Sequence, residues 1–103
     1  MQLVVQEGSL IDDVSLHVPY VLDPDEFPIV VGRDPLAHIR LKDWTVSRTH
    51  CEIRNHKGEI VVRDLDSRNG TRVNGVHVNS HVLVPGDVIS VGFAKLLVEN
   101  VRR

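Results

Sequence analysis

Short apolar runs and strictly alternating positions dominate the chain, whereas few stretches repeat with a helical period. Val, Ile and Leu make up most of these runs, which Gly, Pro, Asn or Asp interrupt every eight to twelve residues. Cys51 and Ile53 alternate with polar neighbours, so we expect them to face the core. Glu52 and Arg54 should then face solvent. This pattern predicts an all-β sandwich or barrel.

The same pattern predicts ten or eleven strands and no helix. Residues 19–28 contain three prolines among acidic residues and predict a turn-rich segment. The pairs Asn69-Gly70 and Asn74-Gly75 predict tight turns, because both residue types tolerate positive φ. The predicted strands are residues 3–6, 14–18, 29–32, 39–41, 51–55, 60–65, 71–73, 76–78, 82–84, 88–91 and 95–101.

A chain of 103 residues, 42% apolar and 25% charged, fits one globular domain, so we expect residues 1–103 to form a single domain of a larger protein. Cys51 is the only cysteine, which excludes an intrachain disulfide and agrees with a reducing compartment. It belongs to the inward set, as a core residue rather than a redox centre. We see no signal peptide and no membrane-spanning run, so we expect a cytoplasmic location, or a nuclear one in a eukaryote.

Charge is unevenly distributed along the chain. The net charge of −2 argues against general nucleic-acid binding. Residues 1–31 carry six acids and no Lys or Arg, whereas residues 32–75 carry nine Lys or Arg against six acids, a surplus of +3. Residues 76–103 carry three against two. The middle of the chain is therefore where an anion is expected to bind.

Three predicted loops in this middle region carry the residue types that bind phosphate. Arg33 follows a glycine and offers a planar fork of donors. Ser47 and Arg48 lie in the next loop and add a hydroxyl and a second guanidinium. Asn69, in the third loop, can bond a ligand's main chain through both its carbonyl and its amide. We therefore expect the three loops to converge on a bound phosphate.

Other readings of the polar residues are weaker. Ser47, His50 and an aspartate could be taken for a catalytic triad, but no G-x-S-x-G motif surrounds the serine. His77 and His81 have no cysteine or carboxylate cluster beside them, so neither a metal site nor a cofactor is predicted. Trp44 either plugs its loop as a buried aromatic or flanks the ligand near the phosphate.

Five motifs in order make the chain resemble the forkhead-associated (FHA) domain, a phosphothreonine-binding β-sandwich. The resemblance runs from about residue 29 to residue 98 and implies two packed sheets of eleven strands, with the binding loops at one end. The motifs are Gly32-Arg33, Ser47-Arg48-Thr49-His50, Asp64-Leu65-Asp66-Ser67-Arg68-Asn69-Gly70-Thr71, Asn74-Gly75 and Gly86-Asp87.

The resemblance assigns a role to each matching position. Arg33 and Ser47 are expected to grip the phosphate, and Arg48 to add a contact. Asn69 is expected to bond the peptide main chain. Arg68 departs from the Ser or Thr common in the family, and either adds charge to the phosphate site or favours an acidic residue C-terminal to the phosphothreonine. The positions implied to support the site are Gly32, His50, Gly70, Thr71 and Asn74.

The implied function is a non-enzymatic reader of phosphothreonine segments in Ser/Thr kinase signalling. Its partner would be a phosphorylated protein or a phosphorylated tail of its own chain, with no nucleic acid and no membrane. The oligomeric state is left open. The alternative is a phospho-independent scaffold that uses a side face of the sandwich. Retention of Arg33, Ser47 and Asn69 favours the reader, because an idle site has no need of them.

Overall fold

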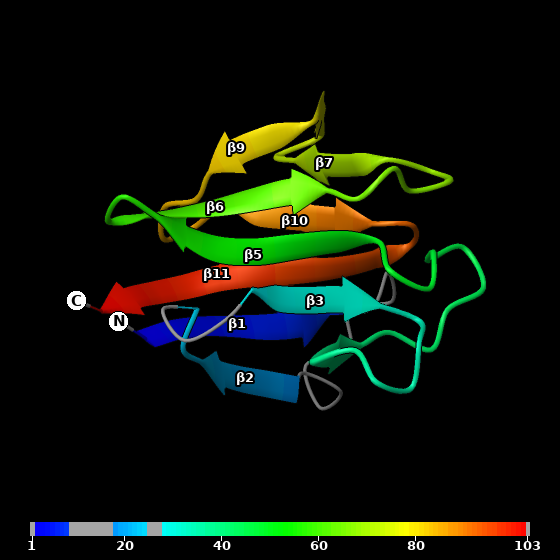
Figure 1. Cartoon of the computed structure of the whole chain (residues 1–103), viewed down its shortest axis with the longest axis horizontal. Helices are drawn as coiled ribbons and strands as arrows, with labels where there is room; N and C mark the ends of the chain where they lie inside the picture. The colour runs from blue at the N-terminus through cyan, green and yellow to red at the C-terminus, as the bar shows by residue number, and fades with distance from the viewer. Residues whose placement is uncertain (1, 9–17, 25–27, 103) are drawn as a thin grey trace.

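The computed structural model describes residues 2–8, 18–24 and 28–102, which form eleven strands in two sheets packed face to face (Figure 1). The strands are β1 (Gln2–Gly8), β2 (Val18–Leu22), β3 (Ile29–Gly32), β4 (Ile39–Arg40), β5 (Cys51–His56), β6 (Glu59–Asp64), β7 (Thr71–Val73), β8 (Val76–Val78), β9 (Ser80–Val82), β10 (Val88–Val91) and β11 (Ala94–Arg102).

The six-stranded sheet has the order β2-β1-β11-β10-β7-β8, and the five-stranded sheet has the order β4-β3-β5-β6-β9. The described pairings are antiparallel except for that of β3 with β4. The predicted sandwich of about eleven mostly antiparallel strands is therefore confirmed. The described residues contain no helix of the length and apolarity that crossing a membrane requires.

Alternate positions of both sheets meet in one apolar core. Cys51 and Ile53 are fully buried, as predicted. Burial, with the nearby Asp64 carboxylate as a lesser cause, raises the pKa of the Cys51 thiol to about 12, so this cysteine is an inert core residue. The apolar core residues are Val5, Ile29, Val31, Ile39, Leu41, Val46, Cys51, Ile53, Ile60, Val62, Val73, Leu83, Ile89, Val91, Leu96 and Val98.

Two predicted strands are displaced in the structure, and five others differ from it by one or two residues at their ends. Most of the strand expected at residues 14–18 lies outside the described residues, and β2 begins where that strand was expected to end. Pro19, predicted to lie in a turn-rich segment, lies within β2, an edge strand that pairs only with β1 among the described strands. An edge strand accepts proline because one row of its N–H groups needs no partner.

The strand expected at residues 82–84 occurs two residues earlier, as β9. It pairs with β6 from Ser80 to Val82. Leu83 then turns into the core, and the Asp87 carboxylate accepts a hydrogen bond from the Val84 N–H at 2.9 Å. This side-chain bond ends the strand, because it offers the backbone an alternative to the sheet ladder.

Four connections lie together at one end of the sandwich, on the right of Figure 1. They are the β3–β4, β4–β5, β6–β7 and β10–β11 loops. The β5–β6 turn and the paired ends of β1 and β11 lie at the opposite end. The first three loops are those expected to bind phosphate.

Candidate functional site

The β3–β4 and β4–β5 loops are joined through their main chains. The Arg33 N–H donates to the Ser47 carbonyl at 3.0 Å, and the Asp34 N–H donates to the Arg48 carbonyl at 3.1 Å. A β-carbon at Gly32 would lie 1.9 Å from the Arg48 carbonyl oxygen. Because no side chain fits there, glycine is required for the two loops to approach this closely.

A hollow of about 240 Å³, here called the cationic hollow, opens between these loops. Its wall contains three guanidinium groups and no carboxylate. Arg33 is oriented by a bond from its Nε to the Val46 carbonyl at 3.1 Å, which leaves its terminal amino groups for a ligand. Such a wall favours an anion. The residues that line the hollow are Arg33, Trp44, Thr45, Val46, Ser47, Arg48 and Arg68.

Ser47 links the β4–β5 loop to the β6–β7 loop. Its hydroxyl oxygen accepts a hydrogen bond from the Arg68 N–H at 2.9 Å. The hydroxyl proton remains available to donate, which is what a phosphate oxygen requires. The same bond brings Arg68 to the rim of the cationic hollow.

His50 holds the same two loops from inside the protein. Its ring is fully buried. The Ser47 N–H donates to Nδ1 at 3.0 Å, so Nδ1 carries no proton and Nε2 donates to the Gly70 carbonyl at 2.8 Å. The imidazole is therefore neutral and uses both nitrogens for structure. It has no free nitrogen with which to act as a base for Ser47.

Asp64 organises the start of the β6–β7 loop. Its carboxylate accepts hydrogen bonds from the hydroxyls of Ser67 and Thr71, and from the Ser67 N–H at 3.1 Å. Burial raises the pKa of Asp64, but these hydrogen bonds outweigh burial and the pKa lies below its ordinary value. Thr71 itself is buried. The carboxylate therefore fixes the loop that carries Arg68 and Asn69.

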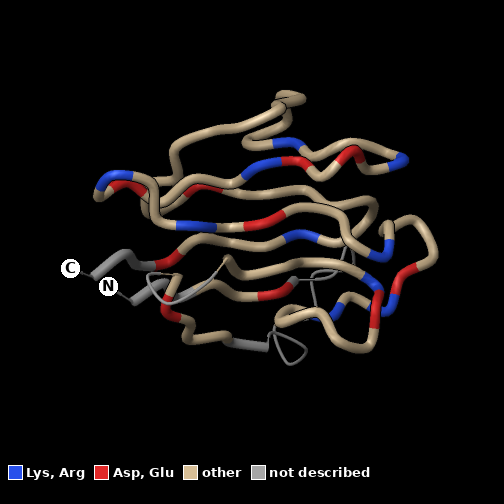
Figure 2. The backbone as a smooth tube through the Cα atoms, in the orientation of Figure 1, with Lys and Arg blue, Asp and Glu red and all other residues tan. Residues whose placement is uncertain are grey.

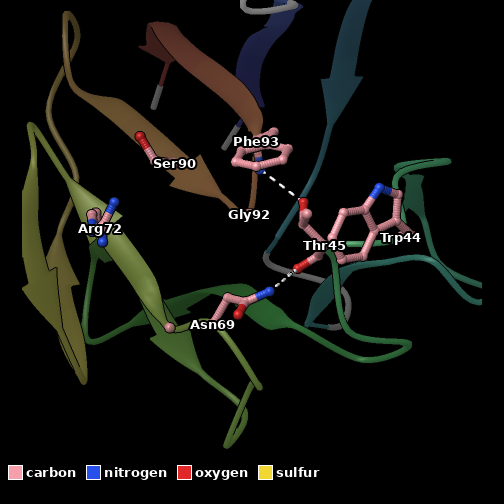
Figure 3. Close-up of a pocket in the computed structure, with 8 residues that line it drawn as sticks. Trp44, Thr45, Asn69, Arg72, Ser90, Gly92 and Phe93 are labelled. Carbon is pink, nitrogen blue, oxygen red and sulfur yellow. Dashed lines mark hydrogen bonds between the residues drawn. The ribbon is translucent and has the colours of Figure 1, made fainter.

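Asn69 is oriented by one hydrogen bond, from its Nδ2 to the Thr45 carbonyl at 2.7 Å (Figure 3). Its Oδ1 and the second amide proton remain available for a ligand's main chain. Thr45 is itself held, because its N–H and its hydroxyl both donate to Asp43 Oδ1 at 2.8 and 2.7 Å. The Thr45 hydroxyl oxygen also accepts the Phe93 N–H at 2.9 Å.

A second hollow of about 330 Å³, here called the aromatic hollow, lies next to the first and shares Trp44 and Thr45 with it. Figure 3 shows Arg72 and Ser90 on the side opposite Trp44. The rings of Trp44 and Phe93 meet edge to face with centroids 6.3 Å apart. Trp44 is 81% exposed, so the buried-plug interpretation is wrong. The lining is completed by Asn69, Gly70 and Gly92.

The structure brings together five predicted ligand residues around one loop cluster: Arg33, Ser47, Arg48, Arg68 and Asn69. Gly32, His50 and Thr71 lie behind them, and Gly70 lines the aromatic hollow. Asn74 does not line either hollow. It lies in the β7–β8 turn, where it bonds Asp87 and Val88.

Thr45, Phe93 and Arg72 were not predicted from the sequence. The Asp43-Trp44-Thr45 segment contains a recognisable signal, since Asp followed two residues later by Thr is typical of a side-chain-stabilised turn. Nothing in the sequence indicates that the Thr45 hydroxyl meets Phe93, which is 48 residues away along the chain. Only the packing of the two sheets brings the β10–β11 loop to the site.

A sequence model of the FHA domain family matches residues 29–92. The chain therefore belongs to the FHA domain family, in agreement with its eleven-stranded sandwich and its loop cluster. The resemblance derived from its motifs is confirmed.

The chain is similar to a curated relative, the oxoglutarate dehydrogenase inhibitor of Corynebacterium efficiens. The two are 45% identical over 73 residues, which cover 71% of this chain and 51% of the relative. The chain thus spans about half the length of the curated relatives it matches first.

Solved structures are similar over nearly the whole chain. One comes from work on phosphothreonine-dependent FHA domain interactions, with 32% identity, a TM-score of 0.80 and coverage of 97% of this chain and 99% of that one. Another is the FHA domain of FhaA complexed with the intracellular domain of Rv3910, with 35% identity, a TM-score of 0.81 and coverage of 94% and 99%. FhaA itself is a Mycobacterium tuberculosis protein.

Proposed function

We propose that this chain is a non-enzymatic module that binds phosphothreonine segments in Ser/Thr kinase signalling. The observation that carries the proposal is the cationic hollow, where three arginines and a serine hydroxyl surround a space without a carboxylate in its wall. Phosphorylation adds about −1.5 to −2 charges and three acceptor oxygens to a threonine. The hollow supplies matching charge and donors at fixed positions.

Each residue has a defined part in this proposal. Arg33 pairs two phosphate oxygens through the terminal amino groups of its fork. Ser47 donates its hydroxyl proton to a third oxygen, and Arg48 and Arg68 add charge at the rim. Asn69 bonds the peptide main chain beside the phosphothreonine. Binding rather than catalysis is supported because His50, the buried imidazole behind Ser47, is held on both nitrogens.

The similar proteins support the same proposal. FHA domain interactions in one of the similar structures are phosphothreonine-dependent, and a second similar structure is a complex with another protein. The Corynebacterium relative is an inhibitor of an enzyme. We therefore propose that the domain belongs to a longer regulatory protein, and that its ligand lies in a partner or in another part of that protein.

The decisive experiment replaces Arg33 with Ala. A screen of degenerate phosphothreonine peptides, with phosphoserine and unphosphorylated controls, first identifies a ligand. Arg33→Ala should then weaken its binding by at least ~30-fold in calorimetric titration, because a charge-assisted pair loses its forked donor. The unfolding free energy should change by less than about 1 kcal/mol, since Arg33 is exposed.

Lys57→Ala is the matched control, because it removes one positive charge in the β5–β6 turn at the end opposite the loops (Figure 2). Its affinity should equal that of the unchanged protein within about twofold. Unchanged affinity in Arg33→Ala, or equal binding of unphosphorylated peptide, would contradict the proposal and favour a side-face scaffold.

A further inference from the structure

A row of polar and cationic side chains crosses the outer face of the six-stranded sheet beside the aromatic hollow. Arg72 on β7 lies opposite His77 on β8 and opposite Ser90 on β10. Ser90 in turn lies opposite Lys95 on β11. Directly opposed residues of neighbouring strands share one face of a sheet. We call His77, Arg72, Ser90 and Lys95 the basic row.

The positions flanking this row along each strand show that it faces outward. Thr71 and Val73, on either side of Arg72, are buried in the core. Val91 is buried as well, next to the half-buried Ser90, while Arg72 and Lys95 are exposed. The basic row is therefore accessible, and its Arg72 and Ser90 also line the aromatic hollow.

Arg72 and Lys95 of the basic row form no ion pair with any described residue. On the outer face of the five-stranded sheet, Glu52 forms ion pairs with Arg54 at 3.5 Å and with Arg63 at 3.4 Å. On that face one carboxylate offsets part of the charge of two arginines, whereas Arg72 and Lys95 have no ion-pair partner among the described residues.

Arg72 is held in place without losing its charge. Its Nε donates a hydrogen bond to His77 Nε2 at 3.1 Å. The terminal amino groups remain available for a forked contact with a carboxylate. A positioned guanidinium beside a hollow is a more specific receptor than a mobile one, because less side-chain entropy is lost on binding.

The path of a bound peptide leads from one hollow to the other. Trp44 and Thr45 line both hollows, and Asn69 lines the aromatic one. A peptide whose phosphate occupies the cationic hollow and whose main chain bonds Asn69 therefore enters the aromatic hollow next. Arg72 lies at this hollow, and Lys95 lies two strands away in the basic row, on the other side of Ser90.

We propose that the aromatic hollow and the basic row bind an acidic flank of the phosphothreonine ligand, with an Asp or Glu carboxylate on Arg72 and further negative charge toward Lys95. This inference rests on the proposed function and defines its ligand class. The Trp44–Phe93 pair supplies an apolar wall for the methylene groups and main chain of the flank. The site thus extends beyond the loops onto the sheet.

The test uses paired phosphothreonine peptides. Each pair carries Asp or Glu in one peptide and Asn or Gln in the other, at successive positions on both sides of the phosphothreonine. The acidic peptide should bind about 5-fold more tightly on one side, and this gain should shrink at high salt, since exposed ion pairs are weak and screened. Fluorescence anisotropy measures both affinities.

Three variants test which residues cause the tighter binding of the acidic peptide. In the double variant Arg72→Gln/Lys95→Gln, the acidic peptide should no longer bind more tightly than the amide peptide. The affinity for the amide peptide should stay within about twofold of that of the unchanged protein. Lys57→Gln removes a positive charge at the opposite end of the sandwich and should retain the gain. Arg68→Gln should retain it as well, because Arg68 lines the cationic hollow instead.

The outcomes separate this inference from the proposed function. Phosphate-dependent binding of the amide peptides with no gain from acids would overturn the inference alone. A gain that survives in the double variant, or that disappears in Arg68→Gln, would also overturn it. Absence of any phosphate-dependent binding would contradict the proposed function and this inference together.

Discussion

The dipeptide Asn-Gly occurs twice in this chain, on the two sides of β7, and the two copies have different conformations. Asn74 and Gly75 both have positive φ, 51° and 83°, and form the two-residue turn between β7 and β8. In the first copy Gly70 has a positive φ of 80° and Asn69 does not. The first copy therefore leads into a strand instead of reversing the chain.

The two asparagine side chains differ in the same way. Asn74 uses both ends of its amide within the protein, donating to Asp87 and accepting the Val88 N–H, each at 2.9 Å. Asn69 makes one described bond, to the Thr45 carbonyl. A satisfied amide supports a fold, whereas an oriented and partly unsatisfied one can bind a ligand. Identical dipeptides thus serve structure in one place and, under the proposed function, recognition in the other.

The largest effect should come from Asn74→Ala. This change removes two hydrogen bonds and places alanine at a positive φ, so it should lower the free energy of unfolding by about 2 to 3 kcal/mol. Denaturation in urea measures the loss. The folded protein should retain its affinity for a phosphothreonine peptide within about twofold, because Asn74 lines neither hollow.

Asn74→Gly separates the two causes. Glycine accepts the positive φ but cannot replace the side-chain bonds, so this variant should be about 1 kcal/mol more stable than Asn74→Ala. Equal stability of the two variants would show that the conformation of the turn contributes little. A large loss of affinity in either variant would contradict the division between the two Asn-Gly pairs.

Asn69→Ala should show the reverse pattern. Loss of its main-chain bonds to the ligand should weaken phosphothreonine binding by about 10-fold, or ~1.4 kcal/mol. The free energy of unfolding should fall by less than about 1 kcal/mol, because Asn69 is exposed and loses one neutral bond. Titration calorimetry and urea denaturation of the same sample measure both. Strong destabilisation with unchanged affinity would remove the contrast with Asn74.

The smallest expected effect concerns the carboxylates of Asp64 and Asp87, which lie near the first and the second Asn-Gly pair respectively. The pKa of Asp87 is lowered from its ordinary value of 3.8, chiefly by the hydrogen bond from the Val84 N–H, with a smaller contribution from Asn74. The pKa of Asp64 is lowered as well. A carboxylate whose pKa is lower in the folded state than in the unfolded state stabilises the folded protein above about pH 3.8. This stabilisation is lost as the pH falls through the folded-state pKa.

Asp87→Asn and Asp64→Asn should therefore each flatten the fall in stability below about pH 4, as measured by urea midpoints at a series of pH values. At pH 7 only Asp64→Asn should also weaken phosphothreonine binding, because Asp64 fixes the loop that carries Asn69. Equal loss of affinity in both variants would argue that the β7–β8 turn also positions the site.

Much of the fold was predictable because apolar periodicity is a local property. The bounds of β3, β7, β8 and β10 agree with the prediction to the residue. Pro19 was misread because proline breaks a central strand but is tolerated at an edge, and edge position is a property of the whole sheet. β9 shifted because the Asp87 carboxylate binds Val84 and competes with the ladder.

In the candidate site, too, some features could be predicted from the local sequence and others depend on tertiary packing. Arg33, Ser47 and Asn69 could be chosen from the sequence because their side-chain chemistry and their motifs are visible there. The exposure of Trp44 and its edge-to-face contact with Phe93 of the β10–β11 loop could not, because both depend on how distant segments pack. The link from Thr45 to Phe93 was hidden for the same reason.

The sequence by itself determined the β-class of the fold, the family, and the residue types of the candidate phosphate site. Those properties follow from periodicity, turn chemistry and the donors of individual side chains, all of which act over a few residues. The tertiary structure alone decided that the two Asn-Gly pairs differ in conformation, that a second hollow adjoins the first, and that Arg72 and Lys95 share one outer face. These depend on pairing between strands far apart in the chain, which no local pattern encodes.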